Sequence, residues 1–318
     1  MKVLMCYSIF REGFEEIARE HELTFPEKRT FSREEILELI PTYDVLCPLH
    51  SMPIDKEIMD AGKQLKLIAN YAVGYNNIDI AYAKSKGIAV AITPSTVTAP
   101  TANLALGLLL DVSRRISEFD RSFRREGRDM KQNLFSNYGM PVDGTVLGIV
   151  GLGRIGKALA ERAIACGMRV VYYNRHQLSQ EEETKLKVSY LSFEELLQTS
   201  DFVSINAPYS SETHHLISEA ELKLMKSTSI LINTSRGPLV DEKALVKALQ
   251  EKSILGAGLD VFEFDEKPLA ELIEMENVVL TPHIGTQTYE CRLKMAREVS
   301  NNIVGFFKKD RYISLVNS

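Results

Sequence analysis

Short apolar runs alternate with helix-like patterns along the first hundred residues. Strands are expected at Val3–Tyr7, Asp44–Pro48, Leu65–Tyr71 and Ile88–Ile92, and helices at Glu12–Arg19, Asp55–Ala61 and Asn77–Ser85. Strands that alternate with helices are typical of a parallel sheet covered on both faces. This part of the chain is therefore predicted to form one α/β domain.

Six further apolar runs predict a second parallel sheet. They are Thr145–Val150, Met168–Tyr173, Phe202–Ala207, Ser229–Thr234, Ala257–Phe262 and Asn277–Thr281. Helical patterns fill the gaps between them. Two of these patterns begin with the spacing of a capping box, Ser192 with Glu195 and Ser218 with Glu221, which marks a helix N-terminus.

The link between the two predicted domains is rich in leucine and alanine. Pro100–Phe119 is apolar on most sides, which indicates one buried helix. A C-terminal helix over Thr288–Lys308 is expected to return to the first domain. The predicted domains are therefore 1–98 with 289–318, and 99–288.

The composition is that of an ordinary globular protein, with 45% apolar and 25% charged residues in 318. A net charge of −5 gives no basic footprint for nucleic acid. No apolar stretch approaches a membrane span, and four scattered cysteines fit a reducing compartment. We therefore expect a cytoplasmic protein with no membrane or nucleic-acid partner. No cluster of metal ligands is evident, and His214 and His215 are read as part of a polar loop.

A glycine fingerprint, Gly151-Leu-Gly153-Arg-Ile-Gly156, follows the first strand of the second domain and opens a helix. In that context the pattern is typical of dinucleotide binding. Gly151 permits a tight turn, Gly153 lets backbone N–H groups approach a pyrophosphate, and Gly156 lets the helix pack on the sheet. The helix N-terminus then offers donors to the phosphates.

The strand after the fingerprint ends in Asn174 and Arg175. An acidic residue there usually accepts from the ribose 2′-OH of NAD, whereas a nearby arginine accommodates the 2′-phosphate of NADP. This favours NADP over NAD. The alternative is that Arg175 faces solvent and Asn174 still bonds a plain ribose.

Ionisable residues follow three strands of the second domain: Arg236, then Asp265 and Glu266, then His283. The carboxyl ends of parallel strands share one edge, where ligands bind. There a cation can hold a substrate carboxylate, and a histidine can transfer a proton at physiological pH. Beside a nicotinamide, this set is suited to the reduction of a carbonyl group.

These features belong to longer motifs, in order, that resemble the D-isomer-specific 2-hydroxyacid dehydrogenases. The motifs are Ile68–Asp79, Thr101–Leu106, the glycine fingerprint, Asn233–Gly237, Gly258–Phe262 and Thr281–Gly285. The resemblance implies an α/β fold with a Rossmann dinucleotide-binding domain and a smaller flavodoxin-like substrate domain. It also implies a homodimer built largely on the cofactor domains.

The resemblance further implies that Arg236 binds the substrate's carboxylate and keto oxygens and that His283 is the acid/base. Substrate contacts are expected from Ser51, Val73 and Gly74. Cofactor contacts are expected from Thr101, Gly151, Gly153, Arg154, Ile155, Gly156, Asn174, Arg175, Asn206, Pro208, Thr234, Asp260 and Gly285.

The chain departs from the family at two of these positions. The family's catalytic glutamate lies five residues after the aspartate of Asp-Val-Phe, where this chain has Asp265 with Glu266 beside it; either is a candidate partner for His283. Asn206 stands where many members carry histidine. We predict interconversion of a 2-keto acid and a D-2-hydroxy acid with NADP or NAD. The alternative, supported by the altered carboxylate, is a non-catalytic NAD(P)H sensor on the same fold.

Overall fold

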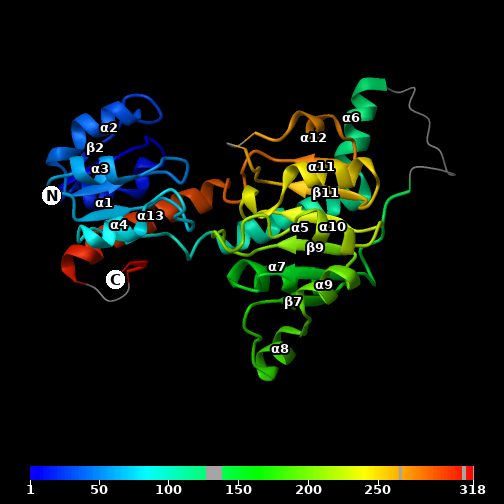
Figure 1. The fold of residues 1–318 in the computed structure, drawn as a ribbon. Coiled ribbons are helices and arrows are strands. Elements are labelled where there is room, and N and C mark those ends of the chain that lie inside the picture. The colour runs from blue at the N-terminus through cyan, green and yellow to red at the C-terminus, as the bar shows by residue number, and fades with distance from the viewer. Residues whose placement is uncertain (127–137, 265–266, 310–312, 318) are drawn as a thin grey trace. The chain divides into compact units, whose positions relative to one another are not determined.

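The computed structural model describes residues 1–126, 138–264, 267–309 and 313–317. The chain divides into two compact units, Met1–Val97 with Thr286–Ser318 (unit 1) and Thr98–Gly285 (unit 2). Both contain parallel sheets flanked by helices (Figure 1). In the part of the chain that the structure describes, no helix has the length and apolar character needed to cross a membrane.

Unit 1 is built on a five-stranded parallel sheet with the order β2-β1-β3-β4-β5. Its strands are β1 (Lys2–Met5), β2 (Glu22–Thr24), β3 (Val45–Cys47), β4 (Leu67–Ala69) and β5 (Ala89–Ala91). All residues of β3 and β4 are buried, as is usual in a sheet covered on both faces. The strand order is that of flavodoxin-like folds, in agreement with the predicted fold class.

Helices cover both faces of this sheet. They are η1 (Arg11–Gly13), α1 (Glu15–Ala18), α2 (Arg33–Leu39), η2 (Ile40–Thr42), α3 (Lys56–Ala61), α4 (Ile80–Ser85) and α13 (Tyr289–Lys308). The cluster on one face contains α1 and α13, and the cluster on the other contains α2, α3 and α4. Gly13 allows η1 to lie against α13, because a Cβ there would come within 2.4 Å of the Ala296 Cβ. The C-terminal helix is therefore an integral part of unit 1.

Unit 2 is built on a seven-stranded parallel sheet with the order β12-β11-β10-β9-β6-β7-β8. Its strands are β6 (Val146–Val150), β7 (Arg169–Tyr173), β8 (Val188–Tyr190), β9 (Phe202–Ile205), β10 (Ile230–Asn233), β11 (Gly256–Leu259) and β12 (Val278–Leu280). The chain runs outward from β6 to β8, returns to β9 on the other side of β6, and runs outward again. This is the Rossmann order, with its switch point between β6 and β9, and it confirms the predicted class.

The helices of unit 2 are α5 (Thr98–Arg114), α6 (Ile116–Glu126), α7 (Arg154–Ala165), α8 (Gln180–Leu186), α9 (Phe193–Thr199), α10 (Glu219–Leu224), η4 (Gly237–Leu239), α11 (Glu242–Gln250) and α12 (Ala270–Glu274). Helices α5 and α7 pack on one face of the sheet, and α9 to α12 pack on the other. Both predicted capping boxes are present, at Ser192 and Ser218.

The expected single helix over Pro100–Phe119 is wrong, because the chain breaks between α5 and α6. Arg115 lies between them in the left-handed region, with φ of 58°. The Asp111 carboxylate accepts from the Ser117 backbone N–H at 2.7 Å and so satisfies a free donor at the start of α6. No glycine or proline marks this break, which is why the apolar pattern did not reveal it.

Strands β2 and β8 were also not predicted. Each is three residues long and only partly buried, so neither produces an apolar run. Both pair with one neighbour only, at the edges of their sheets. Edge strands of this length are recognisable only once the sheet beside them has been built.

Candidate active site

The glycine fingerprint lies at the switch point of the unit 2 sheet, between β6 and α7. Gly151 has φ of 97°, and a Cβ there would lie 2.7 Å from the Ala207 nitrogen. A Cβ on Gly156 would lie 2.5 Å from the Gly151 oxygen. A Cβ on Gly153, in contrast, would meet no atom within 4 Å. Two glycines are therefore required by packing, and the third leaves open space in front of the turn.

Helix α7 begins at that open turn. Gly153 is its N-cap and offers no side-chain hydrogen bond to the first turn. Arg154 and Ile155 are its first two residues. Backbone donors at the N-terminus of a twelve-residue helix, together with its dipole, suit a phosphate group. The arrangement fits the dinucleotide expected here.

The end of β7 supports this turn. The Asn174 Oδ1 accepts from the Leu152 backbone N–H at 2.7 Å, so this side chain holds the glycine turn in place. Arg175 is largely exposed, and its guanidinium lies 3.4 Å from the Glu212 carboxylate. A cation therefore stands at the strand end where the ribose of a dinucleotide is expected.

Two buried polar atoms further along the same sheet edge have no hydrogen-bond partner among the described residues. They are the Asn206 Oδ1, after β9, and the Thr234 Oγ1, after β10. A buried polar atom without a partner is costly, so these atoms are suited to donors or acceptors on a bound molecule. Pro208 lies in the same segment as Asn206. The donors at α7 and these two atoms together fit a nicotinamide dinucleotide.

Arg236 follows β10 and is held by its own turn. The Asn233 Nδ2 donates to the Arg236 carbonyl at 2.9 Å, and the guanidinium donates to the Ser235 carbonyl at 2.6 Å. Burial lowers the pKa of Arg236, because desolvation disfavours its charged form. No described carboxylate forms an ion pair with it. A desolvated guanidinium in this state is suited to an anionic ligand.

Asp260, directly after β11, organises the loop that carries His283. It is 1% exposed, and its carboxylate accepts from the Thr281 hydroxyl at 2.6 Å, the Ile284 N–H at 2.8 Å and the Gly285 N–H at 2.9 Å. Its carbonyl accepts from the His283 N–H at 2.9 Å. Burial raises the pKa of this carboxyl. The resemblance assigned Asp260 to the cofactor, and its role as the anchor of the His283 loop was missed.

The His283 loop is tightly constrained at both ends. His283 itself has φ of 53°, in the left-handed region that few residues other than glycine adopt. The Thr101 hydroxyl of α5 lies 3.4 Å from the Gly285 carbonyl at the end of the loop. Asp265 and Glu266, the expected carboxylate partners of His283, lie outside the described residues. The pairing of His283 with either one stays a prediction.

The expected substrate contacts Ser51, Val73 and Gly74 belong to unit 1. They follow β3 and β4 at the carboxyl edge of that sheet, where an isolated bridge joins Leu49 to Tyr71. The buried Asn70 donates to the Gly74 carbonyl at 2.9 Å and shapes this turn. Ser51 is exposed and Val73 and Gly74 are half-buried, so all three are accessible at their own sheet edge.

His214 and His215 lie in a loop between β9 and α10, as predicted, but the structure places a carboxylate beside them that the sequence did not indicate. The His215 Nε2 lies 2.6 Å from the Glu263 carboxylate, and His214, His215 and Glu263 form one group that could hold a metal ion. Their separation of 48 residues along the chain hid this cluster. No local motif could have revealed it, because the contact depends on the packing of two loops.

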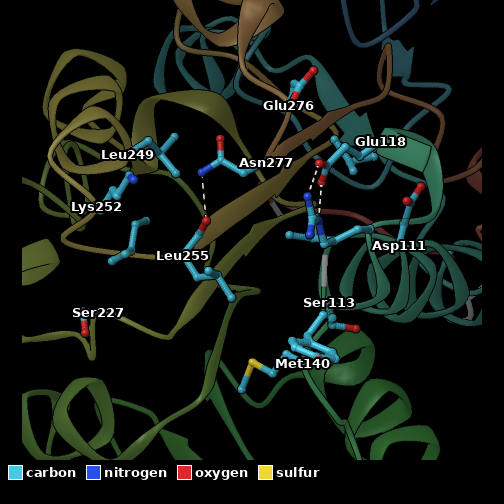
Figure 2. A pocket seen from close by; sticks show the side chains of 16 residues that line it. Asp111, Ser113, Glu118, Met140, Ser227, Leu249, Lys252, Leu255, Glu276 and Asn277 are labelled. Atoms are coloured by element: carbon cyan, nitrogen blue, oxygen red, sulfur yellow. Dashed lines mark hydrogen bonds and ion pairs between the residues drawn. The ribbon is translucent and has the colours of Figure 1, made fainter. Parts of the chain in front are cut away.

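A pocket of about 540 Å³ lies elsewhere in unit 2 (Figure 2). It is lined by the end of α5 and by Ser227, Leu255 and Asn277, which lie within three residues before the starts of β10, β11 and β12. The Asn277 Nδ2 donates to the Leu255 carbonyl at 2.8 Å across it. The pocket is therefore at the amino ends of these strands, whereas ligands of this fold bind beyond the carboxyl ends.

Comparisons with known proteins agree with this geometry. Residues 106–285 match the family described as D-isomer specific 2-hydroxyacid dehydrogenase, NAD binding domain. A glyoxylate reductase from Thermococcus litoralis is 45% identical, over 99% of this chain and 96% of that protein. The crystal structure of a glyoxylate reductase from Paecilomyes thermophila is similar to this chain, with 34% sequence identity and a TM-score of 0.90. The match covers 99% of this chain and 98% of that one.

A third relative was solved with ligands. The NADPH-dependent glyoxylate/hydroxypyruvate reductase of Sinorhizobium meliloti, in complex with NADP and malonate, is 28% identical. Its TM-score is 0.87, over 99% of this chain and 96% of that one.

Proposed function

This chain belongs to the D-isomer-specific 2-hydroxyacid dehydrogenases and is an oxidoreductase that uses NAD or NADP, and from that premise we propose that it reduces glyoxylate and related small 2-keto acids. The observation that carries this proposal is Arg236, a desolvated guanidinium at the carboxyl edge of a dinucleotide-binding sheet. Two of the relatives above are named as glyoxylate reductases and a third as a glyoxylate/hydroxypyruvate reductase. A small anionic substrate suits this half-buried, desolvated cation.

The proposed mechanism assigns one task to each side chain. The Arg236 guanidinium pairs with the substrate carboxylate and polarises the keto oxygen. His283 gives a proton to that oxygen as the carbonyl is reduced and takes it back in the reverse direction. A bound nicotinamide supplies the hydride that reaches the keto carbon. Asp260 holds the His283 loop through three hydrogen bonds, so the backbone that carries the imidazole is fixed before the reaction.

The reaction is tested by mixing purified protein with NADPH or NADH and each of glyoxylate, hydroxypyruvate, pyruvate and a longer 2-keto acid. Loss of the reduced nicotinamide absorbance measures turnover. We expect consumption with glyoxylate and hydroxypyruvate. The absence of turnover with every acid, while cofactor still binds, would contradict the proposal and favour the sensor alternative.

We propose that the enzyme prefers NADPH, with Arg175 as the 2′-phosphate ligand. The Arg175→Gln variant is expected to raise KM for NADPH about tenfold or more, since a hydrogen bond to a charged group contributes about 1.5–3 kcal/mol. KM for NADH should change by less than about twofold, because NADH has no phosphate to lose. Steady-state kinetics with both cofactors provides the measurement.

The matched control for this test is Arg169→Gln, at the opposite end of the same strand and also exposed to solvent. It should leave both KM values unchanged. Equal effects of Arg175→Gln on NADPH and NADH would show that the arginine does not recognise the phosphate, and the preference for NADP would then have no support in this residue.

We also propose a homodimer formed through unit 2. Five large hydrophobic side chains of unit 2 are exposed on α6, on α12 and around the pocket in Figure 2: Ile116, Phe123, Tyr138, Leu255 and Ile273. The Arg121 guanidinium donates to the Glu276 carbonyl and joins α6 to the strand end at this surface. Large apolar side chains that are left exposed are typical of an interaction surface.

Substitution of Phe123 by glutamate is expected to shift the protein from dimer to monomer. The side chain is 53% exposed in the single chain, so the change costs little in the monomer but introduces a charge into an apolar interface. Sedimentation equilibrium of the wild type and the variant measures the mass. Phe264→Glu, at a similarly exposed residue on another part of unit 2, is the control. A wild type that sediments at 35.8 kDa, the mass of one chain, contradicts the proposal.

We propose the cytoplasm as the site of action. All four cysteines are free thiols, and three of them are buried. Persisting free thiols are usual in reducing compartments, which supports this location.

A further inference from the structure

Two loops of unit 2 bring three ligand-type side chains together away from Arg236 and His283. His214 and His215 lie between β9 and α10, and Glu263 follows β11. One potential ligand atom from each lies within 4.8 Å of the others. We propose that these three residues bind a divalent transition-metal ion, with Zn²⁺ as the representative ion. The site is independent of the proposed reductase reaction, which uses none of these side chains.

The hydrogen bond between His215 and Glu263 is the centre of the site. The His215 Nε2 and the Glu263 Oε1 lie 2.6 Å apart. Zinc takes imidazole nitrogen at about 2.0–2.1 Å and carboxylate oxygen at about 2.0–2.2 Å. A metal ion would replace the hydrogen-bonding proton, and the two atoms would separate by less than about 1 Å to accommodate it. The His215 nitrogen and the Glu263 oxygen that would bind the metal ion are thus already directed at one point.

His214 brings a second imidazole to the same point. Its ring stacks on that of His215, with 3.9 Å between the ring centroids and 21° between the planes. The Tyr209 hydroxyl lies 3.4 Å from the His214 Nδ1. With Nε2 of His214 bound to the ion, this contact would orient the ring, since an outer group on the other ring nitrogen is the usual way in which a ligating histidine is oriented. His214 is exposed, so its ring can adjust to an ion without disturbing the core.

The charge around the cluster favours a cation. The Asp241 Oδ2 lies 3.9 Å from the His215 Nδ1. Glu242 is 2% exposed and exchanges two hydrogen bonds with Glu263: each carboxylate accepts from the backbone N–H of the other, at 2.6 and 3.0 Å. In the described part of the chain, no lysine or arginine forms an ion pair with any of these three carboxylates. A bound dication would balance charge that the protein leaves uncompensated.

The loops are held in place before any ion arrives. His215 has φ of 52°, and its backbone N–H donates to the Pro238 carbonyl at 2.9 Å. An isolated bridge joins Ile217 to Val240 beside it. Strained backbone that is fixed by its surroundings is frequent at ligand sites. Two imidazoles and a carboxylate suit zinc, nickel or copper and are poorly suited to magnesium, which prefers oxygen ligands.

The test is a titration of chelator-treated full-length protein with ZnCl₂ by isothermal calorimetry. We expect one ion per chain in the wild type. His214→Ala is the informative variant, because an exposed side chain can be removed without unfolding the protein, as thermal unfolding would verify. Loss of a ligand should weaken binding at least about tenfold, as even outer-shell changes cost about 10–100-fold. Glu263→Gln should weaken it similarly.

His176→Ala removes an exposed imidazole elsewhere in unit 2 and should bind zinc as the wild type does. MgCl₂ in place of ZnCl₂ should give no saturable heat. The proposal is overturned if the wild type binds no zinc, or if His214→Ala binds it as tightly as the wild type. Because the readout is binding rather than turnover, either result is distinct from a failure of the reductase reaction.

Discussion

Replacement of His283 by alanine is expected to lower kcat for glyoxylate reduction by about 10²–10⁴-fold, the usual contribution of a positioned acid or base. The variant loses the group that protonates the keto oxygen. It keeps the glycine turn, the N-terminus of α7, and the Asn206 Oδ1 and Thr234 Oγ1 atoms that have no hydrogen-bond partner among the described residues. NADPH should therefore bind as before. Turnover from absorbance, and cofactor affinity from isothermal titration calorimetry, measure the two effects separately.

The control for this variant is His176→Ala, which removes an exposed imidazole after β7 and should leave kcat unchanged. His283 has φ of 53° and sits in a loop held by Asp260, so correct folding of His283→Ala must be checked by thermal unfolding. Turnover close to the wild-type value in a folded variant would mean that another group supplies the proton, and the assignment of His283 would be wrong.

The architecture of both sheets was accessible from the sequence because parallel strands are buried on both faces. Continuous apolar runs such as Val146–Val150 and Ile230–Asn233 can therefore be recognised as strands without any knowledge of the neighbouring strands. The parallel arrangement also explains why residues of the candidate site could be proposed from the sequence. Residues that follow parallel strands converge at one edge, so Arg236 and His283 could be assigned to one edge although 47 residues separate them.

What the sequence could not supply depends on contacts between distant segments. Asp260 lies in a motif that resembles the family's, but its hydrogen bonds to Thr281, Ile284 and Gly285 arise only after β11 and β12 have paired. The grouping of His215 with Glu263 has the same origin. The break at Arg115 depends on the Asp111 carboxylate reaching the start of α6. For Asp260 and Asp111 a side chain satisfies backbone donors, and for His215 it meets another side chain; no periodic pattern represents either kind of contact.

Replacement of Arg236 by glutamine is expected to reduce kcat/KM for glyoxylate by about 10²–10³-fold, since truncation of one partner of a buried charge pair costs about 2–5 kcal/mol. The substrate carboxylate would enter a desolvated site without its cation. Glutamine is shorter than arginine but remains polar, so the loss reports the charge, the reach and the forked geometry of the guanidinium together. Arg236→Lys keeps the charge but not the fork and should give an intermediate value. Steady-state kinetics with saturating NADPH provides the measurement.

The Arg236→Gln substitution is expected to lower activity without lowering stability. This difference separates a role in substrate binding from a role in holding the fold. Burial lowers the pKa of Arg236, which means that the fold disfavours the charged form relative to water. At neutral pH the unfolded chain is relieved of that penalty, so removal of the charge should raise the free energy of unfolding of the substrate-free protein or leave it unchanged. Urea unfolding of Arg236→Gln and the wild type tests this. A variant that loses both activity and stability would indicate that Arg236 supports the fold around β10, and its role as the substrate's cation would then lack support.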